Sequence, residues 1–123
     1  MNNIVISIGS NHRDRDLYVE QCIDFLRQRF SDVRVSATYS TPADNGRDAD
    51  YLNAVMAGQC TDDYDRTKAL LKLYETAHGR TPLSKALGVV TIDLDIVMWN
   101  GEVLRQRDFD QKYFQIGWKQ LQR

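Results

Sequence analysis

The spacing of apolar residues along this chain switches repeatedly between the period of a strand and the period of a helix. This switching limits the possible folds more than any other feature of the sequence. The β-branched run Ile4–Ile8 is closed by Gly9–Asn11 and predicts a buried strand. Over Asp16–Phe30 the apolar residues recur at helical spacing. Alternation returns over Val33–Tyr39, which predicts a half-buried strand.

The middle of the chain predicts a further strand and helix behind a loop. Ala43–Asp50 is rich in turn-forming residues and is expected to be the loop, and Tyr51–Met56 alternates as a strand. Thr61–Asp63 is expected to cap a helix that ends at Gly79. The apolar stripe predicted for this helix consists of Leu70, Leu73, Tyr74 and Ala77.

The last part of the chain contains the strongest strand pattern, Val89–Trp99, after an expected loop at Arg80–Gly88. Asn100-Gly101 is a turn signal before a short return strand at Val103-Leu104. A final segment is expected around Lys112–Leu121. The apolar residues that share one face of the strong strand are Val90, Ile92, Leu94, Ile96 and Met98.

The order strand, helix, strand, strand, helix, strand is that of a ferredoxin-like α+β sandwich. This βαββαβ arrangement has an antiparallel-rich sheet with the helices on one face. The length of 123 residues fits a single domain, residues 1–123.

Composition limits the partners. The 16 basic and 17 acidic residues give a net charge of −1, which favours neither nucleic acid nor an acidic membrane. No apolar run approaches the ~20 residues of a membrane-spanning helix. No signal peptide is visible, so we expect a cytoplasmic protein. Cys22 and Cys60 lie in apolar stretches and are expected to be buried, reduced thiols.

Two carboxylates on the strong strand are the best candidates for chemistry. Asp93 and Asp95 fall on the face opposite the apolar one, about 6.6 Å apart along the strand. Like charges at this spacing repel each other, and a divalent cation would remove the repulsion. Magnesium is commonly bound by one or two carboxylates together with waters and phosphates. The alternative is a solvated polar strand face, because a lone Asp-x-Asp motif is weakly specific.

Other candidates carry weaker signals. Gly9–Asn11 could approach a ligand or could simply form a turn. Thr41-Pro42 could shape a pocket wall or merely end a strand. Asn53 is an amide inside a strand, where amides are disfavoured, and it could bind the polar edge of a flat ring or face water. Glu75 could be only a surface charge.

Together these residues resemble a known family, the 6-hydroxymethyl-7,8-dihydropterin pyrophosphokinases of folate biosynthesis. The resemblance runs from about Ile4 to Val103 and depends on short motifs that occur in the same order and at similar spacing. These motifs are Ile8-Gly9-Ser10-Asn11, Tyr39-Ser40-Thr41-Pro42, Tyr51-Leu52-Asn53-Ala54, Gly79-Arg80 and Thr91-Ile92-Asp93-Leu94-Asp95-Ile96.

The resemblance implies transfer of a pyrophosphoryl group from ATP to the hydroxymethyl group of the dihydropterin, with release of AMP. Asp93 and Asp95 would hold two magnesium ions, and Arg80 would assist catalysis at the phosphates. The pterin would lie against Thr41, Pro42, Tyr51 and Asn53, and the nucleotide against Glu75, Arg80 and Ile96.

The sequence also departs from the family pattern. Ala86–Thr91 stands where the family has Arg-Trp-Gly-Pro-Arg-Thr, Pro82 replaces another arginine, and Asp108 replaces a histidine. The aromatic residue that stacks on the pterin aligns loosely with Ile116, and Phe114 or Trp118 could replace it. The chain is also shorter at its C-terminus than the usual family member.

These departures leave three hypotheses open. The first is an active enzyme. The second is a weakened or inactive relative that serves as a pterin-binding or regulatory module. The third is an interaction protein without a small ligand, either a monomer or a homodimer. Arg80, Lys85, Arg105, Arg107 and Lys112 remain as possible substitutes for the missing cations.

Overall fold

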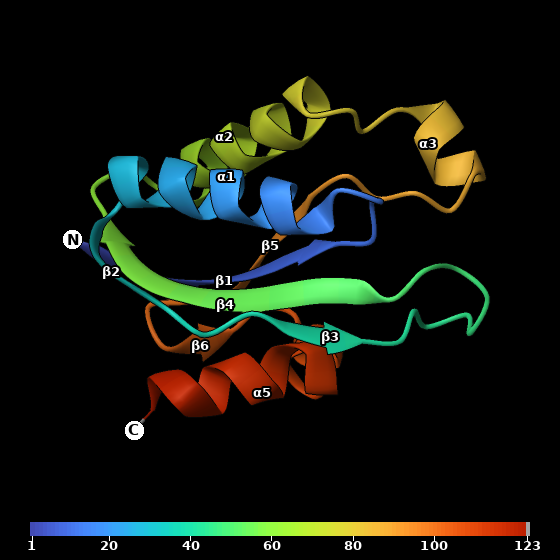
Figure 1. Cartoon of the computed structure of the whole chain (residues 1–123). Helices are drawn as coiled ribbons and strands as arrows, with labels where there is room; N and C mark the ends of the chain where they lie inside the picture. The colour runs from blue at the N-terminus through green and yellow to red at the C-terminus, as the bar shows by residue number, and fades with distance from the viewer. Residues whose placement is uncertain (123) are drawn as a thin grey trace.

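The computed structural model describes residues 1–122, which form a six-stranded antiparallel sheet with helices on both sides (Figure 1). The strand order is β2-β4-β1-β5-β6, and β3 also pairs with β4. The elements are β1 (Asn2–Ser10), α1 (Arg15–Arg29), β2 (Ser31–Val35), β3 (Tyr39–Thr41), β4 (Tyr51–Cys60), α2 (Tyr64–Ala77), α3 (Pro82–Ala86), β5 (Asp93–Trp99), β6 (Glu102–Val103), α4 (Gln106–Phe109) and α5 (Lys112–Leu121).

The ferredoxin-like prediction is confirmed. Strand β1 lies at the centre and pairs antiparallel with both β4 and β5, and helices α1 and α2 lie together over one face of the sheet (Figure 1). The main core fills the space between this face and the two helices. It contains Ile6 of β1, Leu26 of α1, Met56 of β4, Leu71 of α2 and Leu94 of β5, all at most 2% exposed. Cys22 and Cys60 are free thiols buried in the same core, as expected.

The apolar stripe predicted for α2 is wrong in part. Leu73 is 69% exposed and Ala77 is also exposed, whereas Thr67, Leu71 and Glu75 are buried. Two of these three buried residues are polar, so the apolar pattern does not identify the buried face of the helix. Each is hydrogen-bonded: Thr67 Oγ1 donates to the Asp63 carbonyl at 2.8 Å, and Glu75 Oε2 accepts from the Leu94 amide at 2.7 Å. Such bonds remove much of the cost of burying a polar group.

The predicted strand Val33–Tyr39 is interrupted in the structure. β2 ends at Val35, β3 begins at Tyr39, and Ala37 is exposed rather than buried. The Ser36 hydroxyl accepts a 2.9 Å hydrogen bond from the Val55 amide, and the Ser36 amide donates to the Val55 carbonyl at 2.9 Å. A serine side chain that bonds to a neighbouring strand replaces regular ladder pairing there.

Further differences lie between α2 and α5. β5 begins at Asp93 rather than Val89. The expected loop Arg80–Gly88 contains α3, whose Thr81 forms a reciprocal capping box with Ser84. A β-bulge in β5 changes the phase of the strand, since Ile6 pairs with Ile96 while Val5 pairs with Met98. Met98 therefore packs on the opposite face from the one its alternation predicts.

Helix α5 covers the second face of the sheet (Figure 1). The expectation that all helices lie on one face is therefore wrong. Its Phe114 and Leu121 form a smaller core with Val5, Val55 and Val97. The segment Lys112–Leu121 is the final segment that the sequence predicts. Within residues 1–122, no helix combines the length and the apolar character needed to cross a bilayer.

Gly117 lets α5 approach the sheet closely, and replacing it should destabilise the fold. A Cβ at this position would lie 2.6 Å from Val55 Cγ2 and 2.8 Å from the Tyr39 hydroxyl oxygen. Overpacking of this kind costs about 1–3 kcal/mol, which exceeds the helix-propensity gain from alanine of ~1 kcal/mol. Gly117→Ala should therefore lower the free energy of unfolding in a urea titration. Exposed Lys119→Ala in the same helix should change it by less than about 0.5 kcal/mol. Equal stabilities of the two variants would contradict this packing.

Candidate active site

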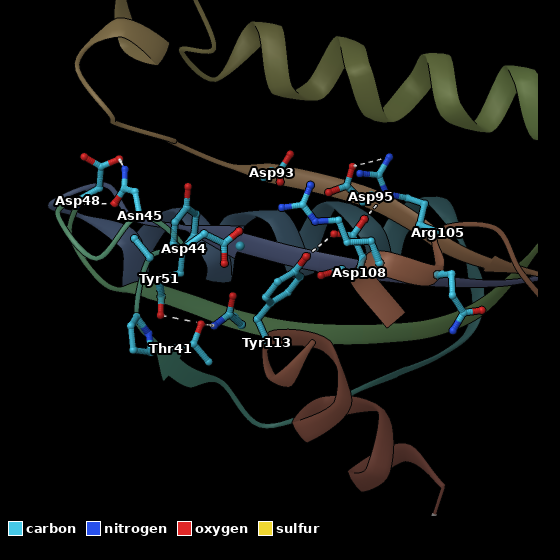
Figure 2. Close-up of a pocket in the computed structure, with 17 residues that line it drawn as sticks. Thr41, Asp44, Asn45, Asp48, Tyr51, Asp93, Asp95, Arg105, Asp108 and Tyr113 are labelled. Carbon is cyan, nitrogen blue, oxygen red and sulfur yellow. Dashed lines mark hydrogen bonds and ion pairs between the residues drawn. The ribbon is translucent and has the colours of Figure 1, made fainter. Parts of the chain in front are cut away.

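The part of the second sheet face beyond the α5 core forms the floor of a cavity of about 560 Å³ (Figure 2). The cavity is lined by residues from four strands of the sheet, from the loop after β3, from α4 and from the start of α5. Ser7, Gly9, Asp93 and Asp95 lie on its floor. Ser7 pairs with Asp95 and Gly9 pairs with Asp93 across β1 and β5. The two smallest side chains therefore stand beside the two carboxylates and leave space above them.

The residues that the resemblance assigns to the pterin lie together on the cavity wall. Thr41, Pro42, Tyr51 and Asn53 all line it. Asn53 is 3% exposed, and its Nδ2 donates to Thr41 Oγ1 at 2.7 Å and to the Tyr39 carbonyl at 3.2 Å. These bonds fix the amide with Nδ2 directed toward the protein, so Oδ1 is the atom left for a ligand donor.

Asp93 belongs to a group of three charged side chains, with Arg80 and Glu75. Arg80 Nη1 lies 2.8 Å from Asp93 Oδ1 and 3.2 Å from Glu75 Oε2. Burial is the largest single influence and raises the pKa of Asp93, but the hydrogen bond from Arg80 and several smaller contributions together outweigh it, so the pKa lies below its ordinary value. The Glu75 side chain is 1% exposed. Burial raises the pKa of Glu75, opposed by its hydrogen bond from the Leu94 amide. Glu75 does not line the cavity and is not a surface charge.

Asp95 is less well compensated than Asp93. Its side chain is 20% exposed, and Arg105 Nη1 lies 3.9 Å from its Oδ1. Burial first, and the neighbouring charge of Asp93 second, raise the pKa of Asp95 from its ordinary value of 3.8 to about 7. The two carboxylates project from the same side of β5 (Figure 2), so the charge of Asp93 makes ionisation of Asp95 more costly.

A second cavity of about 220 Å³ lies on the α2 side of β5. Ile96 lines it, as do Tyr64, Lys68 and Lys72 of α2. Asp95 and Arg105 line both cavities, so the two cavities meet at these residues. The residues that the resemblance assigns to the nucleotide are therefore divided: Ile96 lies in this cavity, and Arg80 and Glu75 lie beside Asp93.

Sequence analysis named Arg105 and Arg107 as possible substitute cations and noted Asp108, but it did not predict that α4 and the first turn of α5 form a wall of the cavity. Arg105, Arg107, Asp108 and Tyr113 all line the main cavity. Short helices give no clear period, so α4 left no pattern to detect.

Phe114 is fully buried in the small core, and neither Ile116 nor Trp118 lines the cavity. Among the substitute cations, Arg105 and Arg107 reach the main cavity and Arg80 reaches Asp93, while Lys85 and Lys112 line neither cavity.

The two carboxylates fit a hard divalent cation that takes its other ligands from outside the protein. Asp93 and Asp95 supply oxygen, which magnesium prefers. Within residues 1–122, no group of three or more histidine, cysteine, aspartate or glutamate side chains is placed to hold a metal. A cation at Asp93 and Asp95 would therefore take its remaining ligands from water or from a phosphate, which is how magnesium commonly binds.

Two comparisons with known proteins find similar sequences. A family model described as 7,8-dihydro-6-hydroxymethylpterin-pyrophosphokinase matches residues 5–123. The chain is also 33% identical over 106 residues to a Bacillus subtilis (strain 168) protein named 2-amino-4-hydroxy-6-hydroxymethyldihydropteridine pyrophosphokinase. The matched region covers 83% of this chain and 63% of that relative, so the chain spans less than two thirds of the relative's length.

The raised pKa of Asp95 makes the stability of the protein depend on pH. The folded protein holds a proton on Asp95 between about pH 4 and 7 that the unfolded chain has released, so stability falls as pH rises through this range. Asp95→Asn removes this loss and should be more stable than wild type at pH 8, on the order of 2 kcal/mol after allowing for solvent screening. Urea titrations should show the gap closing near pH 4. The matched control Asp32→Asn, at an exposed position, should show no such pH-dependent difference in stability from wild type. A stability difference for Asp95→Asn that does not change with pH would show that the Asp95 proton is not its cause.

Proposed function

Because this chain belongs to the 7,8-dihydro-6-hydroxymethylpterin-pyrophosphokinase family, we propose that it transfers the pyrophosphoryl group of ATP to 6-hydroxymethyl-7,8-dihydropterin. In this reaction the substrate hydroxyl oxygen forms a bond to the β-phosphorus of ATP. The bond from that phosphorus to the α,β-bridging oxygen breaks, AMP leaves, and the hydroxyl proton is released. The observation that carries the proposal is the carboxylate pair Asp93 and Asp95 in the main cavity, with Asp95 also lining the second cavity.

The main cavity suits the pterin. Its wall offers Tyr51 as a flat surface and Asn53 Oδ1 as an acceptor for the ring's N–H groups. Thr41 fixes the orientation of the Asn53 amide, and Pro42 shapes the wall beside it. A pterin held here would direct its hydroxymethyl group toward Asp95 if its polar edge lay against Asn53.

The second cavity suits the nucleoside part of ATP. Ile96 and Tyr64 offer apolar surface, and Lys68 and Lys72 place positive charge at its rim. The phosphates would then extend to the junction, where Arg105 lines both cavities. Arg80, beside Asp93, is the second arginine near the phosphates. Glu75 would act on the nucleotide only through Arg80, which it holds from behind the sheet.

Asp93 and Asp95 would hold magnesium, expected as two ions. When bound, magnesium neutralises charge on the phosphate oxygens, which is most of what phosphoryl-type transfer requires of an enzyme. Arg105 and Arg80 would bind and orient the phosphates with their fixed pattern of N–H donors. The protein's own contribution is therefore positioning and charge rather than covalent participation.

The alternative function is that of a pterin-binding or regulatory module. The segment Pro82–Val90 contains no arginine, and its cation Lys85 lines neither cavity. Calorimetry separates the alternatives. Binding of the hydroxymethylpterin without binding of α,β-methylene ATP would favour the module, whereas binding of both would favour the enzyme.

The decisive experiment mixes the protein with ATP, magnesium and 6-hydroxymethyl-7,8-dihydropterin and measures AMP by a coupled assay. We expect AMP release that requires all three components. Asp95→Asn should lower the rate by at least about 100-fold, the usual scale for losing one preorganised electrostatic group. Since this variant is expected to be more stable at neutral pH, its loss of rate cannot be attributed to unfolding.

The control for this assay is Asp32→Asn, an exposed residue of β2 outside both cavities, which should keep the wild-type rate. AMP release that is equal in wild type and Asp95→Asn, or that is absent from wild type, would contradict the proposed function.

A further inference from the structure

Asp108 joins two neighbouring residues on the wall of the main cavity. Arg105 immediately precedes α4, Asp108 lies within α4, and Tyr113 lies in the first turn of α5. Asp108 Oδ2 accepts a hydrogen bond from Arg105 Nε, and its Oδ1 accepts one from the Tyr113 hydroxyl (Figure 2). The Asp108 side chain is only 14% exposed. Both oxygens of this carboxylate are therefore fixed by the protein.

Arg105 has a second carboxylate within reach. Its Nη1 lies 3.9 Å from Asp95 Oδ1, which is close enough for charge attraction but too far for a hydrogen bond. A guanidinium presents donors along more than one edge and forms its strongest pairs with two parallel hydrogen bonds. Because Asp108 binds the Nε edge, Arg105 is not free to turn and close such a pair on Asp95.

We propose that Asp108 is a positioning residue that holds the Arg105 guanidinium at the junction of the two cavities and off the Asp95 carboxylate. The inference rests on the proposed function, because it assumes that Asp95 binds a cation and that Arg105 faces a phosphate. Asp108 itself need not touch either substrate.

The physical reason is competition between two carboxylates for one cation. The Arg105 side chain is 50% exposed, so without its bond to Asp108 it has room to rotate. The nearest remaining carboxylate is that of Asp95, whose Oδ1 already lies 3.9 Å from Arg105 Nη1. An arginine closed onto Asp95 competes with a divalent cation for the same oxygens. Tyr113 strengthens the arrangement by fixing the rotamer of Asp108.

The test is Asp108→Asn, which keeps the shape of the side chain and removes its charge. Binding of Mn²⁺ is measured by electron paramagnetic resonance in the presence of α,β-methylene ATP. We expect Mn²⁺ to bind about tenfold more weakly, the scale of one lost charge-assisted hydrogen bond. In the AMP assay the magnesium concentration for half-maximal rate should rise by a similar factor. The rate at saturating magnesium should change much less, a split that general loss of structure would not produce.

A double variant distinguishes positioning from a direct effect of the Asp108 charge on the metal. If Asp108 acts through Arg105, the Asp108→Asn change should have little effect on Mn²⁺ binding in an Arg105→Gln background. An undiminished effect there would overturn the inference. Asp110→Asn, an exposed residue two positions further along the chain, is the matched control and should bind Mn²⁺ as wild type does.

Two further outcomes keep this test separate from that of the proposed function. Should Asp108→Asn fail to fold by circular dichroism, Tyr113→Phe should still weaken Mn²⁺ binding, by about threefold, since it removes one of the two bonds to Asp108. Unchanged binding in that variant would overturn the inference. If wild type binds Mn²⁺ and the variants behave as expected but no AMP appears, the proposed function fails while the positioning role of Asp108 stands.

Discussion

The pairing of β1 with β4 on one side and β5 on the other is the constraint on which the whole site depends. This register sets Gly9 between Asn53 and Asp93, and Ser7 between Val55 and Asp95. A shift of one residue in either pair would turn these side chains to the other face and expose the main core. The apolar side chains of the same strands, such as Ile6, Ile8 and Leu94, oppose that shift because they are buried under α1 and α2. The hydrophobic core thus fixes the positions of the polar groups on the opposite face.

The charges of the site are arranged at some expense of stability. Asp93 is matched by Arg80, which Glu75 holds from the interior. Asp95 has Arg105 only at 3.9 Å and keeps a raised pKa. A protein that needed only to fold would gain by replacing Asp95 with a neutral residue, so its retention fits a functional requirement. The Arg105, Asp108 and Tyr113 group extends the same charge network to the helical wall.

The sequence predicted the sheet side of the site well and the helical side poorly, for physical reasons. Period-two alternation places Asp93, Asp95 and Asn53 on a definite face, and the order of elements then brings these strands together. The position of Glu75 escaped prediction because its burial depends on a hydrogen bond to the amide of Leu94, 19 residues further along the chain. The bulge that turns Met98 depends on pairing with β1, which local pattern does not reveal. Arg105, Asp108 and Tyr113 lie near or within short helices whose placement follows from packing against the finished sheet.

The placement of α4 gives this scaffold a way to vary. Helix α4 and the first turn of α5 enclose the side of the cavity opposite the loop after β3. The proposed catalytic carboxylates instead lie on the sheet. Helix α5 also has attachments outside that wall, through Gly117 against Tyr39 and through Arg34 bonded to the Leu121 carbonyl. Insertions or deletions between Val103 and Lys112 can therefore remodel the binding chamber without disturbing strand pairing. One part of the cavity lining is thus encoded outside the strands of the sheet, and natural selection can alter that part while conserving the strands.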